Sequence, residues 1–353
     1  MTHNLPWRVG QGLVQLALVG MLLVLVGAGS GARAGNLPIL RITSENGPDH
    51  VQTRILKLFG ERLQQRLAGR YDVRYFPSAQ LFRDRDVVVA LRSGLVEMAV
   101  PGTWQLDRHV PDVGVLFLPL FYGRGQEEID KVRDGPLGVA LSKRIEDQSG
   151  LKVLGPWIDL GFSDIFLTRA ALKDKGPPND YAALRGLAVR IPGGDANAER
   201  LRLLGMRPVI ITWPDLPQQL DQGNLEGLVS TPETVASANL WDHGLAAMFE
   251  DHQYFSYYVP LMSSSFWQHA DPQSRAILIQ TWSELVGEAR LMARQAQEQA
   301  HAQILRHGMR IFTPSPESLT GQRWRIMVAQ DDLVLRLGID PALVDMARRE
   351  VGQ

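Results

Sequence analysis

The chain has 353 residues, no cysteine and a formal net charge of −1, with 45% hydrophobic and 21% charged residues. This is the composition of a folded globular protein. The near-neutral charge gives no support for a nucleic-acid-binding function, which normally requires a basic excess. The lack of cysteine excludes a disulfide scaffold, a Cys-ligated metal centre, a thiol nucleophile and the lipid anchor of a lipoprotein.

The first 34 residues have the layout of a cleavable secretory signal. Arg8 precedes an apolar run from Leu13 to Ala28, which is shorter than the roughly 20 residues that a membrane span needs. The run is followed by Ala32-Arg33-Ala34, an A-x-A cleavage pattern. We therefore expect residues 1–34 to be a signal peptide that is removed near Ala34, and the rest of the chain to be exported. An uncleaved N-terminal anchor is the alternative.

Strands and helices are predicted to alternate along the exported part. The first half predicts strands and helices, in chain order, at Pro38–Ser44, Asp49–Ala68, Tyr71–Phe76, Asp86–Ser93, Val96–Val100, Gln126–Gln148 and Leu151–Trp157. The second half continues the rhythm with Leu187–Ile191, Ala196–Leu204, Pro208–Thr212, Leu216–Gln222, Leu225–Ser230, Thr234–His243 and a strand at Gln253–Ser264. This pattern is typical of an α/β fold with a mostly parallel sheet.

The length of the exported part indicates two domains, because single cores stop growing at about 250–300 residues. Asp271–His307 contains Gly or Pro only at Pro272 and Gly287. It therefore predicts one long helix of about 50 Å, long enough to cross two domains. The best linker signal is Lys173–Asp180, which reads KDKGPPND.

The common catalytic motifs are missing from the sequence. The histidines form no H-E-x-x-H spacing, and there is no G-x-S-x-G or G-x-x-x-x-G-K-[ST] motif. The pair Gly193-Gly194 precedes a predicted helix and is able to bind a phosphate, but Asp195 as a helix N-cap is the simpler interpretation. We therefore expect no catalytic residues, no metal ligands and no cofactor, and a protein that closes on a small solute.

Several motifs in order resemble those of the solute-binding proteins of TRAP transporters, the DctP-like family. They are Phe76–Leu81 (FPSAQL), Ser93–Val100 (SGLVEMAV), Val110–Phe121, Leu184–Pro192 (LRGLAVRIP), Leu225–Gly227 (LEG) and Pro260–Trp267. Each motif is weak alone, but their order and spacing are specific, and they cover nearly the whole exported chain.

The resemblance implies a periplasmic protein that delivers an organic acid to the membrane permease subunits of a sodium-driven transporter. It also implies a two-lobed periplasmic binding protein fold, with cross-strands and a long helix spanning both domains. On this basis we expect domain I at 35–160 plus about 250–285, and domain II at 161–249 plus about 286–353.

Arg190 is the residue that the resemblance assigns to the ligand carboxylate, because it matches the arginine of the family's "RVP" motif. A guanidinium stays charged and presents a planar fork of donors that matches a carboxylate. In a partly desolvated cleft this ion pair strengthens when the domains close. A strand-end arginine paired with one of the protein's own carboxylates is the alternative.

Two departures from the family pattern affect the predicted ligand. The segment that often reads "GFR" is Gly161–Asp164 here, without arginine, and the family's "QENP" corresponds to a segment with Thr231 and Glu233. Ser163, Asp164, Thr231 and Glu233 are therefore candidate ligand residues, because hydroxyls and carboxylates hydrogen-bond to ligand hydroxyls.

Four further candidates follow strands at the end where α/β proteins bind ligands. Glu45 and Asn46 come after the first strand, and Trp104 and Trp213 follow two others. Each also has an ordinary structural interpretation. Tyr257-Tyr258 is interpreted as cross-strand packing.

A carboxylate anchor surrounded by hydroxyl-binding groups favours a sugar acid such as a uronate or aldonate. A C4-dicarboxylate and a 2-oxo or hydroxy acid are the alternative ligands. A periplasmic enzyme acting on such acids is the rival of another class, and a sensory binding protein that reports to a kinase is a third hypothesis.

Overall fold

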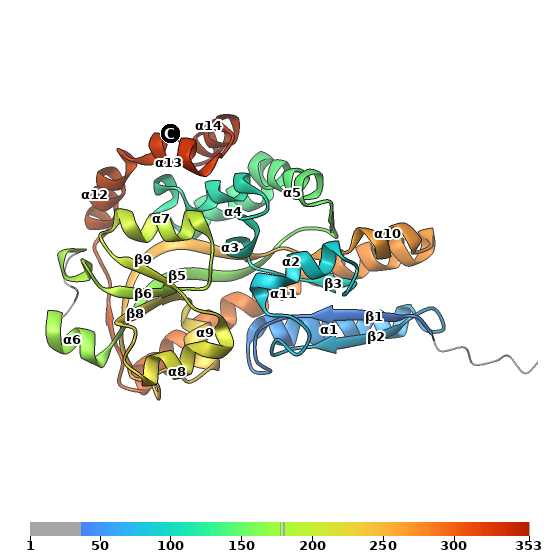
Figure 1. Cartoon of the computed structure of the whole chain (residues 1–353), viewed down its shortest axis with the longest axis horizontal. Coiled ribbons are helices and arrows are strands. Elements are labelled where there is room, and N and C mark those ends of the chain that lie inside the picture. Colours follow the sequence, from blue (N-terminus) through green and yellow to red (C-terminus); the bar gives the residue numbers. More distant parts are fainter. Residues whose placement is uncertain (1–36, 177, 179–180, 353) are drawn as a thin grey trace, which may run out of the picture. The chain divides into compact units, whose positions relative to one another are not determined.

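The computed structural model of the chain describes residues 37–352 except 177, 179 and 180, so the predicted signal peptide lies outside the described residues. Two β-sheets, each covered by helices, make up this part (Figure 1). No helix among the described residues combines the length and the apolar character needed to cross a membrane.

The first sheet has the strand order β2-β1-β3-β10-β4. Its strands are β1 (Ile39–Thr43), β2 (Asp72–Phe76), β3 (Met98–Ala99), β4 (Lys152–Val153) and β10 (Leu261–Met262). Strand β1 pairs in parallel with β2 and β3, whereas β10 runs antiparallel to β3 and β4. We call this sheet, together with its helices α1 (Val51–Arg66) and α2 (Asp84–Arg92), lobe A.

The second sheet has the strand order β11-β9-β5-β8-β6-β7. Its strands are β5 (Ile158–Thr168), β6 (Ala188–Ile191), β7 (Arg207–Ile210), β8 (Gly227–Ser230), β9 (Leu245–Tyr258) and β11 (Arg310–Phe312). We call this sheet, together with α7 (Asp195–Leu203), α8 (Leu216–Asp221) and α9 (Pro232–Ser237), lobe B. The long strands β5 and β9 are antiparallel, so the sheets are mixed and the prediction of a mostly parallel sheet was wrong.

The helices surround the two sheets. The α-helices are α1 (Val51–Arg66), α2 (Asp84–Arg92), α3 (Thr103–Leu106), α4 (Gln126–Asp134), α5 (Pro136–Ser149), α6 (Arg169–Lys175), α7 (Asp195–Leu203), α8 (Leu216–Asp221), α9 (Pro232–Ser237), α10 (Ser264–His269), α11 (Pro272–Arg306), α12 (Pro316–Met327), α13 (Gln330–Leu337) and α14 (Pro341–Glu350). Short 3₁₀ helices are η1 (Pro111–Phe117), η2 (Pro119–Phe121), η3 (Tyr181–Leu184) and η4 (Trp213–Asp215).

Several predicted boundaries were wrong for local physical reasons. The helix predicted at Gln126–Gln148 is two helices, because Gly135 caps α4 and Pro136 begins α5. The strand predicted at Gln253–Ser264 begins earlier, at Leu245, and forms β9 and the separate strand β10. Strand β5 and helices α12–α14 were not predicted. The predicted linker is in part the end of α6, and its residues 177, 179 and 180 lie outside the described residues.

The long helix α11 confirms the sequence prediction and packs against both lobes. Asp271 caps its first turn, where its side chain accepts the Ser274 N–H at 3.0 Å, and Pro272 occupies the first helical position. The helix packs against α1 in lobe A and against α9 and β5 in lobe B. Figure 1 shows β5 and β9 running side by side through the centre of the molecule, and α11 contacts β5.

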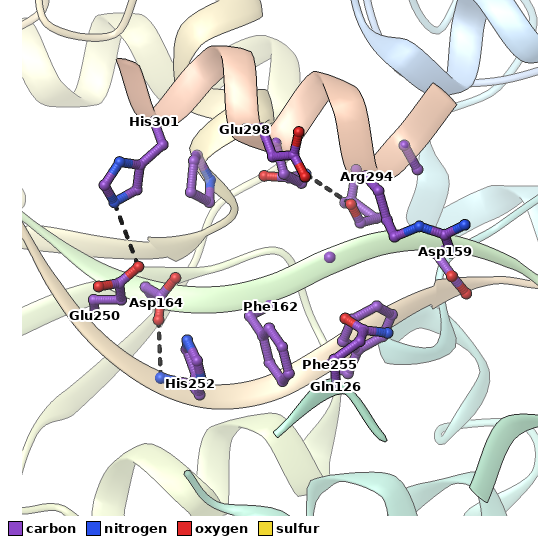
Figure 2. Close-up of a pocket in the computed structure, with 15 residues that line it drawn as sticks. Gln126, Asp159, Phe162, Asp164, Glu250, His252, Phe255, Arg294, Glu298 and His301 are labelled. Atoms are coloured by element: carbon purple, nitrogen blue, oxygen red, sulfur yellow. Dashed lines mark hydrogen bonds and ion pairs between the residues drawn. The ribbon is translucent and has the colours of Figure 1, made fainter. Parts of the chain in front are cut away.

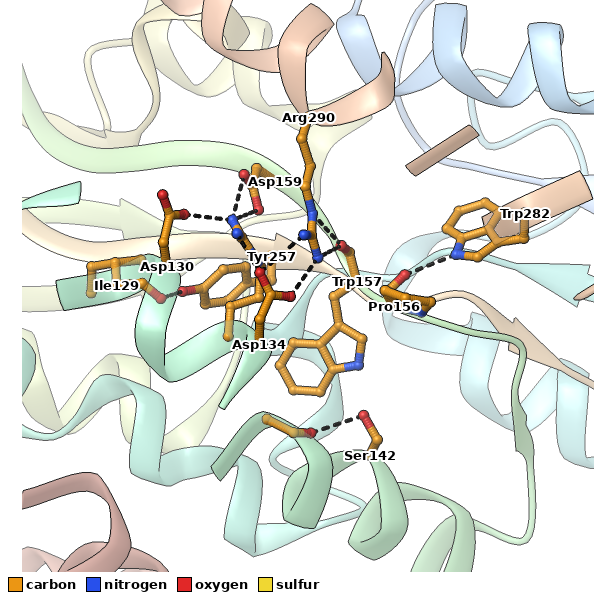
Figure 3. Close-up of polar contacts among 12 residues, drawn as sticks. Ile129, Asp130, Asp134, Ser142, Pro156, Trp157, Asp159, Tyr257, Trp282 and Arg290 are labelled. Atoms are coloured by element: carbon orange, nitrogen blue, oxygen red, sulfur yellow. Dashed lines mark hydrogen bonds and ion pairs between the residues drawn. The ribbon is translucent and has the colours of Figure 1, made fainter. Parts of the chain in front are cut away.

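Polar contacts fix α11 to the start of β5 (Figure 3). The Trp282 Nε1 donates to the Pro156 carbonyl at 2.8 Å, and the Arg290 Nη2 donates to the Trp157 carbonyl at 2.8 Å. Arg290 also binds Asp134 of α4, with 2.9 Å between Nη2 and Oδ1. The side chain of Trp282 is fully buried and meets Phe59 of α1 edge-on, with 5.1 Å between ring centroids.

We predict that Trp282→Ala lowers the free energy of unfolding by about 3–5 kcal/mol, because it leaves a large cavity and an unpaired carbonyl between α1 and α11. Urea unfolding followed by circular dichroism measures this value. Leu335→Ala is the matched control: Leu335 is 81% exposed, so the expected change is within about 0.5 kcal/mol. A loss below about 1 kcal/mol in Trp282→Ala would contradict this role.

Candidate functional site

Arg190 lies in β6, and its side chain is buried with only 3% exposure. Its Nε donates to the Ile211 carbonyl at 2.9 Å. Among the described residues, this guanidinium forms no other hydrogen bond and no ion pair, so Nη1 and Nη2 have no protein partner. Burial lowers the pKa of Arg190 to about 10, which leaves it charged at neutral pH.

Arg190 faces a cavity whose walls come from both lobes and from the β5–β9 pair. The lining side chains include Glu45, Asn46, Asp84, Trp104, Ser163, Arg190, Trp213, Ser230, Thr231, Thr234, Tyr254, Ser256 and Tyr258. The cavity measures about 40 Å³. This holds a few water molecules but is far below the roughly 300–1,000 Å³ of typical small-molecule pockets. A solute larger than that therefore requires the walls to move apart.

Two carboxyl groups lie against each other on the lobe A side of this cavity. Glu45 is only 6% exposed, and its Oε1 has no hydrogen-bond partner. Burial raises the pKa of Glu45, against the opposing effects of a hydrogen bond from the Asp84 backbone and of the Arg190 charge. Burial, followed by the neighbouring Glu45 charge, raises the pKa of Asp84. This carboxyl pair therefore retains a proton above the usual pH range of such groups.

Two tryptophans contribute aromatic surface to the cavity. Trp104 is 6% exposed, its Nε1 has no hydrogen-bond partner, and its ring meets that of Tyr258 with 5.5 Å between centroids. The ring of Trp213 is half-buried and its centroid lies 5.7 Å from Cζ of Arg190. This contact favours a fixed orientation of the guanidinium.

The other polar candidates in the cavity are already hydrogen-bonded within the protein. Asn46 Nδ2 donates to Gln52 at 2.6 Å and to Tyr258 at 2.9 Å. The Ser163 hydroxyl is 2.7 Å from that of Ser256. Thr231 caps α9 by accepting the Thr234 N–H at 3.3 Å. Because these side chains are already hydrogen-bonded within the protein, they form the wall of the cavity and offer few free donors to a ligand.

Two predicted ligand residues do not line this cavity. Asp164 lies on the opposite face of β5 from Ser163, as successive strand residues do, and its Oδ1 accepts the His252 N–H at 2.9 Å. The Glu233 Oε1 accepts the Val51 N–H at 2.7 Å, and its Oε2 is 3.1 Å from His50 Nε2. Glu233 thus connects α9 with the start of α1.

The start of α7 is not open to a phosphate. The Asp107 Oδ2 accepts the Ala196 N–H at 2.9 Å, so a protein carboxylate already occupies this helix end. The N-cap residue is Gly194, and not Asp195 as predicted. The described residues also contain no group of three or more His, Asp or Glu side chains that could hold a metal ion.

Sequence reasoning missed Asp84 and the tyrosines of β9. Asp84 begins α2 and carries no spacing signal that connects it with Glu45. Tyr254, Ser256 and Tyr258 follow the two-residue period of one strand face, which is the signal that was available. Tyr258 was interpreted as packing only.

Known proteins share this fold, and some are related to this chain in sequence. The chain is 25% identical to the C4-dicarboxylate-binding protein DctB of Bacillus subtilis, over 69% of this chain and 66% of that protein. It is also 25% identical to the C4-dicarboxylate-binding periplasmic protein DctP of Rhodobacter capsulatus, over 79% and 83% of the two chains.

A solved structure and a family model extend these likenesses. The sugar acid binding protein DctPAm of Advenella mimigardefordensis, solved with galactonate, superposes with a TM-score of 0.81 at 19% identity, over 90% of this chain and 98% of that one. At that identity the likeness concerns the fold, and it confirms the predicted two-lobed α/β architecture. The family model of the bacterial extracellular solute-binding proteins, family 7 (DctP), matches residues 42–330. The chain therefore belongs to this solute-binding protein family.

Proposed function

We propose that this protein captures a sugar acid, such as a uronate or aldonate, at Arg190 and delivers it to the membrane subunits of a TRAP transporter. The observation that carries the proposal is the buried Arg190 guanidinium, whose two terminal nitrogens have no protein partner among the described residues and face a cavity between the lobes. Membership of a family of solute-binding proteins for organic acids supports it.

The ligand carboxylate is expected to bind Nη1 and Nη2 of Arg190 in a bidentate pair. The guanidinium is already desolvated and oriented by the Ile211 carbonyl, so little further ordering is needed. Because bulk water is largely excluded from this site, the ion pair is stronger than a surface pair.

The carboxyl pair Glu45–Asp84 favours hydroxyl groups at the other end of the ligand. A second ligand carboxylate there meets two acidic groups, whereas a hydroxyl donates to the free Glu45 Oε1. The unpaired Trp104 Nε1 offers a donor, and its ring offers a face for the C–H surface of a sugar. The galactonate-bound relative supports this choice.

A C4-dicarboxylate is the second candidate, because both sequence relatives described above are named for such ligands. A 2-oxo or hydroxy acid is also compatible with Arg190. These hypotheses differ from the favoured one in the ligand group that faces Glu45 and Asp84, which is a hydroxyl group in a sugar acid and a second carboxylate in a C4-dicarboxylate.

We further propose that domains I and II of the sequence analysis close around the solute; their ranges differ from lobes A and B, because most of β9 lies in the range of domain I. The proposed moving parts are residues 35–160 with about 250–285, and residues 161–249 with about 286–353. The small volume of the cavity, about 40 Å³, is consistent with a nearly closed arrangement. The contact between Glu233 and Val51 connects α9 with α1, so Glu233 is proposed to stabilise closure instead of binding ligand.

The proposed location is the periplasm, after removal of the signal near Ala34. A periplasmic enzyme acting on the same acids is the rival, and recovery of an altered ligand after incubation with the protein would favour it. An uptake assay distinguishes a sensory role from transport. Only a transport protein restores uptake of the solute when it is combined with TRAP membrane subunits.

We predict that galactonate and glucuronate bind more tightly than succinate, and that Arg190→Lys weakens sugar-acid binding at least tenfold. Lysine keeps the charge but loses the bidentate geometry, which is worth about 1.5–3 kcal/mol. Isothermal titration calorimetry on the full chain measures the affinities. Arg207→Lys is the control, because Arg207 is an exposed arginine of the neighbouring strand β7.

Equal affinities of Arg190→Lys and the unaltered protein would exclude Arg190 as the anchor. Tighter binding of succinate than of either sugar acid would instead favour the dicarboxylate hypothesis.

We predict that galactonate affinity falls as the pH rises from 6 to 9, and that Glu45→Gln removes most of this dependence. An anion bound at Arg190 disfavours ionisation of the Glu45–Asp84 pair, so the protein takes up a proton when the ligand binds. The affinity therefore falls as rising pH removes the proton from the pair in the free protein. For one proton the fall is at most about tenfold per pH unit. Calorimetry across this range measures the slope. The control variant Glu61→Gln, on the exposed side of α1, should keep the pH dependence of the affinity. An equal slope in Glu45→Gln and in the unaltered protein would refute the coupling between ligand binding and the carboxyl pair.

A further inference from the structure

A second, larger cavity lies behind the Arg190 cavity, between the β5–β9 pair and α11 (Figure 2). Its volume is about 550 Å³, within the range of small-molecule binding sites. The floor comes from β5 and β9, and α11 contributes a stripe of side chains with helical spacing: Ala293, Arg294, Gln297, Glu298 and His301. We call it the rear cavity.

Strand alternation makes one pair of strands the wall of both cavities. Ser163 and Tyr254 point into the Arg190 cavity, whereas Phe162, Asp164 and Phe255 point into the rear cavity. The rear cavity therefore lies among the three long elements, β5, β9 and α11, that extend between the lobes. Asp164, which the sequence indicated as a ligand residue, belongs to this second space.

Acidic groups predominate at one end of the rear cavity. Asp164 is only 1% exposed, and no basic side chain pairs with it among the described residues. Glu250 lies close to it in Figure 2, with its Oε1 at 3.4 Å from His301 Nε2 and its Oε2 accepting from Thr313 at 2.7 Å. Glu298 on the rim has no ion-pair partner in the described part of the chain.

The opposite end of the rear cavity carries a basic side chain, Arg294, with no ion-pair partner among the described residues. Arg294 extends there from α11 toward Asp159, as Figure 2 shows. Asp159 is already neutralised by Arg133, whose Nη1 lies 2.7 Å from its Oδ2. A cationic group is thus repelled from the Arg294 end and attracted to the Asp164 end.

An aromatic surface lies between these two ends. The rings of Phe162 and His252 stack with 4.1 Å between centroids, and Phe255 meets Phe162 edge-on at 4.9 Å. His252 has a φ of 47°, a left-handed conformation that costs free energy in a non-glycine residue. Its carbonyl accepts the Gly123 N–H at 2.9 Å and its N–H binds Asp164, so the surrounding structure maintains this conformation.

We propose that the rear cavity is a second binding site, which takes a small organic cation with a flat apolar body. The ammonium or similar group is placed beside Asp164 and Glu250. The apolar body packs against Phe162 and Phe255, where the aromatic faces also attract positive charge. Burial and the nearby Asp251 charge raise the pKa of Asp164, so a bound cation restores its ionisation and releases a proton.

Gln297 connects the rear cavity with the Arg190 cavity. Its Nε2 donates to the Leu160 carbonyl at 2.7 Å and to Thr231 Oγ1 at 3.3 Å, and Leu160 and Thr231 both line the Arg190 cavity. A Cβ on Gly161 would lie 2.9 Å from this side chain, so strand and helix are in close contact there. A ligand bound in the rear cavity should therefore alter the affinity for the sugar acid. This coupling rests on the proposed function, whereas the proposal of a second site does not.

Calorimetric titration of the full chain with benzylamine and with benzyl alcohol, its neutral analogue of nearly equal shape, tests the site. Benzylamine is expected to bind at least tenfold more tightly. Asp164→Asn should abolish this preference while keeping an oxygen for the His252 N–H, and Glu250→Gln should reduce it. Heats measured in two buffers of different ionisation enthalpy should show proton release, which Asp164→Asn removes.

Equal binding of the two probes overturns the proposal. Loss of the preference in Glu45→Gln but not in Asp164→Asn also overturns it, because the cation is then bound beside Arg190. Should either rear-cavity variant fail to fold, the other still decides the question.

The coupling is measured as galactonate affinity with and without saturating benzylamine, with an expected change of about fivefold or more. Failure of benzylamine binding with intact galactonate binding refutes only the second site. Intact benzylamine binding without galactonate binding refutes only the proposed function.

Discussion

A buried cation without a carboxylate partner is the constraint on which the rest of the site depends. A charge removed from water is costly unless it is paired, yet the Arg190 guanidinium has one hydrogen bond, to the Ile211 carbonyl, and a contact with the Trp213 ring. The Glu45 and Asp84 carboxyl groups moderate its field but form no ion pair with it among the described residues. In the proposed function, the carboxylate of the solute is this missing partner, so a wall whose other polar groups are mostly hydrogen-bonded already can still select an anion.

The elements that build this wall also form a wall of the rear cavity. Strands β5 and β9 present one face to the Arg190 cavity and the other to the rear cavity, and α11 covers the rear side. Arg290 and Trp282 fix α11 to the start of β5, while Gln297 reaches Thr231. The proposed closure would therefore change both spaces together, and these contacts are the proposed connection between them.

Sequence reasoning singled out Arg190 and predicted much of the fold, and its errors have local causes. Arg190 was proposed because the segment around it resembles a family motif, and α11 was predicted because its caps and its lack of helix-breaking residues are local signals. Strand β5 was missed because it is buried on both faces and irregular, with register shifts near Gly161 and Ser163. Without that strand, the opposite directions of Ser163 and Asp164 were not predictable. Asp84 meets Glu45 only through tertiary packing.

A crystal structure of the full chain with galactonate is the most direct test of Arg190 as the carboxylate anchor. We expect the ligand carboxylate within hydrogen-bond distance of Nη1 and Nη2 of Arg190, and a ligand hydroxyl on Glu45. A structure in which Arg190 pairs with Glu45 or Asp84 while the ligand carboxylate lies elsewhere would contradict it.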